Sequence, residues 1–70
     1  MESNIEKLNK KIATVTAKKE KYESAVKMLE SGAFPQNSQV DALIGAYRMK
    51  IAELKHEIAC GLVLREIFTA

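Results

Sequence analysis

The side chains best suited to chemistry lie between positions 53 and 60. Glu53 and His56 have the Glu-x-x-His spacing with which helical bundles bind two iron ions, where each of two helices supplies one such pair. Ligands in those bundles project inward. Here Leu54 falls on the apolar stripe of its helix, which directs Glu53 and His56 outward to solvent. The spacing therefore favours a solvated pair of side chains over a metal site.

His56 and Cys60 are four residues apart and share one face of a helix. Two ligands fall short of the four that zinc requires, so a zinc site would need pairs from two chains. Cys60 is the only cysteine, which excludes an internal disulfide. The single histidine and the three separate glycines provide neither a nucleophile with its base nor a phosphate-binding loop. We therefore expect no catalytic residue, no metal ligand and no cofactor, and we expect the protein not to be an enzyme.

A row of lysines is the strongest charge pattern in the chain. The row consists of Lys7, Lys11, Lys18 and Lys21, with Thr14 between the second and third lysine. Successive members are three or four residues apart, so they lie along one stripe of a helix. Such a row could contact the phosphates of a nucleotide or a nucleic acid. The row contains no aromatic side chain to stack on bases and no arginine for two-pronged contacts, so a solvated face is the favoured interpretation. Phosphate binding by these four lysines is the alternative.

The first helix is predicted over residues 4–30. Ser3 and Glu6 have the spacing of a capping box at its start, and Gly32 suits the left-handed conformation that ends a helix. Apolar side chains fill every seam position of a seven-residue repeat but one, where Lys19 stands. The seam residues are Ile5, Leu8, Ile12, Val15, Tyr22, Val26 and Leu29. We expect Lys19 to set the register or to extend outward.

Residues 31–38 are predicted to form a turn, and residues 39–68 a second helix. Pro35 prevents simple continuation of the first helix, and Phe34 is expected to fold over the end of the bundle. Ser38 and Asp41 have the spacing of a second capping box. A turn this short makes the two helices antiparallel neighbours.

The second helix has its own apolar stripe, which predicts how the helices pair. The stripe consists of Val40, Ile44, Tyr47, Ile51, Leu54, Ile58 and Leu62. An antiparallel pairing places Leu29 near the first two stripe residues and Tyr22 near the third or fourth. The last two steps of the stripe are both four residues, so the repeat is expected to slip, with Gly61 falling where a large residue was due.

Glycines interrupt the second helix at positions 45 and 61, and each costs about 1 kcal/mol relative to alanine. Close approach of the helices is the favoured reason, and a groove for a ligand or partner is the alternative. The residues after Gly61 are apolar around most of the helix circumference, which calls for burial on more than one side. This predicts an oligomer or partner interface at Leu62, Val63, Leu64, Ile67 and Phe68.

The stretch from Ser38 to Tyr47 resembles a family of small aspartyl-phosphate phosphatases, which are also helical hairpins. It places Ser38 and Asp41 ahead of a Leu-Ile…Tyr pattern, over ten residues of the chain. The family has its serine four residues before the aspartate, where Asn37 stands here. Because of that departure, no phosphatase activity is carried over to this chain.

Length and composition support one small all-α domain over residues 1–70. A hydrophobic fraction of 47% and a charged fraction of 29% are unlike those of a disordered chain. The polar start lacks a secretory signal and no apolar run could span a bilayer, so we expect a cytoplasmic protein without a membrane partner. A chain this short without disulfides usually needs a partner chain for stability. The predicted fold is an antiparallel two-helix hairpin that self-associates into a dimeric four-helix bundle or a higher oligomer.

The expected function follows from this architecture. We expect a non-catalytic binding or regulatory protein, of the inhibitor or adaptor type, that acts through protein–protein contacts as a homo-oligomer. Its partners would be a second copy of itself and another protein. Binding of a nucleotide or nucleic acid is the alternative, and the small size also fits a phage product.

Overall fold

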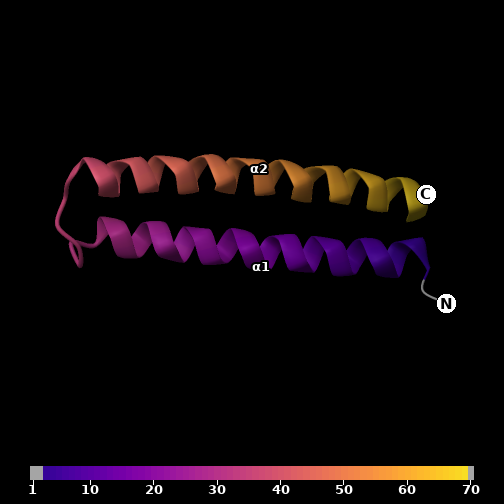
Figure 1. Ribbon diagram of the computed structural model, residues 1–70. Helices are drawn as coiled ribbons and strands as arrows, with labels where there is room; N and C mark the ends of the chain where they lie inside the picture. Colours follow the sequence, from indigo (N-terminus) through magenta and orange to yellow (C-terminus); the bar gives the residue numbers. More distant parts are fainter. Residues whose placement is uncertain (1–2, 70) are drawn as a thin grey trace.

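The computed structural model describes residues 3–69, which form two long helices. Helix α1 comprises Asn4–Glu30 and helix α2 comprises Ser38–Thr69. The two lie side by side and antiparallel, joined by the turn at one end (Figure 1). The opposite end, where α1 begins and α2 finishes, is called the open end below. The predicted all-α hairpin is confirmed, and the molecule measures 50 × 17 × 15 Å.

Both ends of α1 follow the local chemistry of the sequence. The side-chain oxygen of Ser3 accepts a hydrogen bond from the backbone N–H of Glu6 at 3.1 Å, which satisfies one of the free amides of the first turn. Gly32 has a φ of 88°, a left-handed conformation that a side chain would oppose. The start and the end predicted for this helix are therefore confirmed.

Helix α2 begins with a different cap from the one predicted. The side-chain oxygen of Asn37 accepts from the backbone N–H of Val40 at 2.9 Å, and Ser38 is already the first helical residue. Asparagine and serine are about equally good N-cap residues. Because Asn37 and not Ser38 is the N-cap residue, the predicted capping box of Ser38 and Asp41 is wrong by one residue.

The turn itself departs from prediction at Phe34. Its side chain is 46% exposed rather than folded over the end of the helices. The turn is held instead by polar contacts. The side-chain amide of Gln36 donates a hydrogen bond to the backbone carbonyl of Leu29 at 3.2 Å, which uses one of the last free carbonyls of α1.

A thin core runs along the line where the helices meet. Near the turn, Val26, Leu29 and Ile44 form a buried cluster, and farther along Val15 and Leu54 are each 4% exposed. The rings of Tyr22 and Tyr47 meet edge to face, with centroids 5.2 Å apart. The predicted pairing of Tyr22 with Tyr47 and of Leu29 with Ile44 is confirmed.

The seam of α2 continues through Gly61 and not through Leu62. Gly61 is buried, whereas the side chain of Leu62 is 39% exposed. The step from Ile58 is therefore three residues, and the seven-residue repeat does not slip as predicted. The reason lies in α1, because the side chain of Ile12 occupies the space beside Gly61 that a larger residue would need.

Lys19 occupies its seam position by extending to the edge. Its Nζ lies 3.5 Å from a carboxylate oxygen of Glu23, one helical turn away, and its side chain stays 23% exposed. This agrees with the prediction that it would extend outward. Within residues 3–69, no helix is both long and apolar enough to cross a membrane.

Candidate interaction surfaces

Large apolar side chains are exposed at the open end of α2. The five residues predicted as an interface are between 39% and 63% exposed: Leu62, Val63, Leu64, Ile67 and Phe68. At about 100° per residue they spread over roughly two thirds of the helix circumference. A single flat partner therefore cannot cover all five at once, and the question is which of them share a surface.

One of these five residues lines an apolar groove between the two helices. We call it the terminal groove, and its floor and walls are formed by Leu8, Ile12, Val15, Gly61 and Leu64. Its rim carries Lys11, His56, Glu57 and Cys60, and its volume is about 240 Å³. Leu64 is the only one of the five predicted interface residues that lines it.

A second apolar surface continues from this groove around α2. It is lined by His56, Ala59, Cys60, Val63 and Leu64. His56, Cys60 and Leu64 line both surfaces, so the terminal groove and this patch are continuous. Val63 thereby joins Leu64 on one extended apolar face.

The side chains that were weighed as metal ligands lie on the exposed surface of α2. The Sγ atom of Cys60 lies 3.6 Å from Nε2 of His56, and both residues are exposed. Glu53 is also exposed, and its carboxylate lies 3.6 Å from Nζ of Lys50. Among residues 3–69, no three histidine, cysteine or acidic side chains are grouped to hold a metal ion.

The predicted lysine row is divided by the structure. Lys18 and Lys21 line a groove together with Tyr22, Ala25, Tyr47 and Lys50, which we call the lysine–tyrosine groove. Lys11 lies farther along, on the rim of the terminal groove, and Lys7 lines neither. Three ammonium groups and two tyrosines thus gather at one place, and none of the acidic residues between positions 3 and 69 lines it.

Sequence reasoning missed Lys50 and the tyrosines as neighbours of the lysine row. The tyrosines were recognised only as seam residues, and Lys50 lies on the other helix. The signal that could have found them is the pairing of Tyr22 with Tyr47. In an antiparallel hairpin, the residues that flank those two seam positions on one side share a groove.

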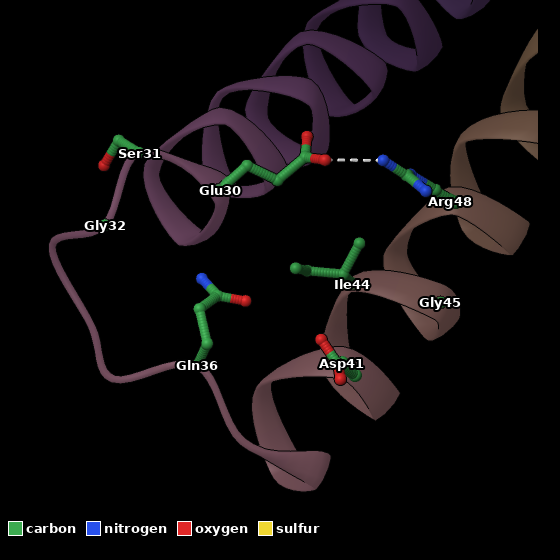
Figure 2. Close-up of a pocket in the computed structure, with 8 residues that line it drawn as sticks. All are labelled: Glu30, Ser31, Gly32, Gln36, Asp41, Ile44, Gly45 and Arg48. Carbon is green, nitrogen blue, oxygen red and sulfur yellow. Dashed lines mark hydrogen bonds and ion pairs between the residues drawn. The ribbon is translucent and has the colours of Figure 1, made fainter.

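A polar pocket lies where the turn joins both helices. Figure 2 shows Glu30 at the end of α1 extending toward Arg48 on α2, with Asp41 and Gly45 on the same side of α2. The Glu30 Oε2 and Arg48 Nη2 atoms are 2.6 Å apart. This ion pair links the two helices. Because the carboxylate of Glu30 neutralises the guanidinium of Arg48, the pocket is a poor site for an anion.

The chain matches no family model, no curated protein and no solved structure.

Proposed function

We propose that this chain is a non-catalytic binding or regulatory protein, of the inhibitor or adaptor type, that acts through protein–protein contacts as a homo-oligomer. One observation carries the proposal. The chain exposes 5309 Å² of surface. A compact monomer of 7.8 kDa exposes about 4,400 Å².

The excess of roughly 900 Å² is close to what each partner contributes to a standard protein–protein interface, about 800 Å². Its distribution also favours a partner. The hairpin covers each helix on one side only, and no described side chain is completely buried. Large apolar side chains remain exposed at the open end, where an interface would cover them.

Charge substitutions at two apolar positions of α2 test this proposal. Leu64 lies on the extended apolar face, whereas Met49 is 70% exposed and lines none of the grooves described above. We expect Leu64→Glu to weaken self-association about tenfold or more, measured by sedimentation velocity, because it buries a charge in an apolar contact. Met49→Glu should leave association unchanged. Equal association of both variants and the parent chain would count against the apolar face.

Binding of a phosphate-bearing ligand, a nucleotide or nucleic acid, is a second candidate function. The lysine–tyrosine groove favours it, because Lys18 and Lys21 form no ion pair within residues 3–69. The ion pair of Lys50 with Glu53 is long, at 3.6 Å. Three ammonium groups without a lining carboxylate attract phosphate oxygens. The tyrosine rings pack against each other, so the site would recognise phosphate charge more than bases.

A further inference from the structure

Building on the proposed function, we propose that the terminal groove binds a second copy of this chain about a two-fold axis, with Lys11 of each copy facing Glu57 of the other. Homo-oligomers most often assemble through such isologous contacts, in which one surface patch meets itself.

The floor of the groove is apolar and lies where the two helices approach closely. Gly61 has no side chain, and the side chain of Ile12 fills the space beside it. Ile12 and Leu8 are only partly buried in the single hairpin. Leu64 stands on the α2 wall with its side chain 45% exposed. An apolar side chain from a partner would complete this packing.

The rim of the groove provides the argument for a second copy. Lys11 lies on α1 and Glu57 on α2, and both line the same groove. Within residues 3–69, neither side chain forms an ion pair or a hydrogen bond. A rim with one cation on one helix and one anion on the other is complementary to itself after a two-fold rotation.

The orientation follows from that pairing. A two-fold axis parallel to the helices places α1 of one copy over α2 of the other, and Lys11 then faces Glu57 at two symmetric places. The same rotation makes every facing pair of helices antiparallel. This is the relative orientation that neighbouring helices have in an antiparallel four-helix bundle.

Like charges limit how far the contact extends toward the turn. Lys18 lies seven residues from Lys11, and Lys50 lies seven residues from Glu57, so both occupy the same side of the hairpin two helical turns farther on. Copies aligned along their whole length would bring Lys18 of one against Lys50 of the other. We therefore place the contact in the half nearest the open end, with the copies diverging before Lys18.

A mixing experiment tests this pairing at low ionic strength. The variants Lys11→Glu and Glu57→Lys each place like charges at both symmetric contacts, so each alone should associate about tenfold more weakly than the parent chain. An equimolar mixture restores an acid opposite a base at both contacts. We expect the mixed pair to associate within about threefold of the parent, measured by sedimentation velocity with one variant fluorescently labelled.

Lys18→Glu is the matched control, because it makes the same charge change outside the contact and should not weaken association. Positions 11 and 57 are exposed, so circular dichroism should show unchanged helix content in both variants. A mixture that associates no better than its components would overturn the proposed pairing. Parent-like association of both single variants would place the interface elsewhere while leaving the proposed function standing. A parent chain that stays monomeric would overturn both.

Discussion

Gly61 of α2 lies directly against the side chain of Ile12 of α1, so the two helices approach each other closely at this position. A Cβ built at position 61 would lie 2.8 Å from Cγ1 of Ile12, a distance that real Cβ atoms essentially never show. A Cβ at Gly45, the other helical glycine, would meet no described atom of α1 within 4 Å. The two glycines of one helix therefore have different structural roles.

This difference predicts opposite effects of the same substitution. Gly61→Ala should lower the free energy of unfolding by about 1 kcal/mol, because a clash of about 1–3 kcal/mol outweighs the gain in helix propensity. Gly45→Ala should raise the free energy of unfolding by about 0.5–1 kcal/mol, since only the propensity gain remains. Urea unfolding at one fixed protein concentration measures both, and a stabilising Gly61→Ala would refute the close approach.

Asn37 and Ser38 provide a second matched pair. Asn37→Ala removes the side-chain oxygen that caps α2, so we expect a loss of about 1 kcal/mol in the free energy of unfolding. Ser38→Ala should change the free energy of unfolding by less than about 0.5 kcal/mol, because Ser38 lies inside the helix and Asn37 provides the cap. Thermal unfolding of the two variants decides between the caps, and a larger loss at Ser38 would contradict the structure.

Phosphate binding at the lysine–tyrosine groove has its own control in the same lysine row. Lys21→Glu should weaken binding of a fluorescent nucleoside triphosphate at least about tenfold at low salt, since it replaces an attraction by a repulsion. Lys7→Glu changes the net charge equally but lies outside the groove, and should have little effect. Fluorescence anisotropy measures both. Equal losses would show general charge attraction, and absence of binding by the parent chain would remove this second candidate.

The sequence was sufficient for those features that depend on neighbours along the chain. The extents of both helices, the cap at Ser3 and the left-handed Gly32 follow from local residue types. The pairing of Tyr22 with Tyr47 followed because a short turn leaves an antiparallel hairpin few alternatives.

Features that depend on the facing helix were not predictable in this way. The seam passes through Gly61 because Ile12, 49 positions earlier, fills the space beside it, and the stripe on α2 alone suggested Leu62. The grouping of Lys50 with Lys18 and Lys21 likewise arises only when the helices pack. The cap at Asn37 was missed for a local reason, since two adjacent residues had nearly equal capping strength.

The most direct test of the central claim is the mass of the full chain in solution, measured by sedimentation equilibrium over a range of concentrations. Self-association predicts a mass that rises from 7.8 kDa toward twice that value or more, with helix content preserved throughout. A chain that remains fully helical at 7.8 kDa up to millimolar concentration would contradict the account, because its exposed apolar face would then need no second copy.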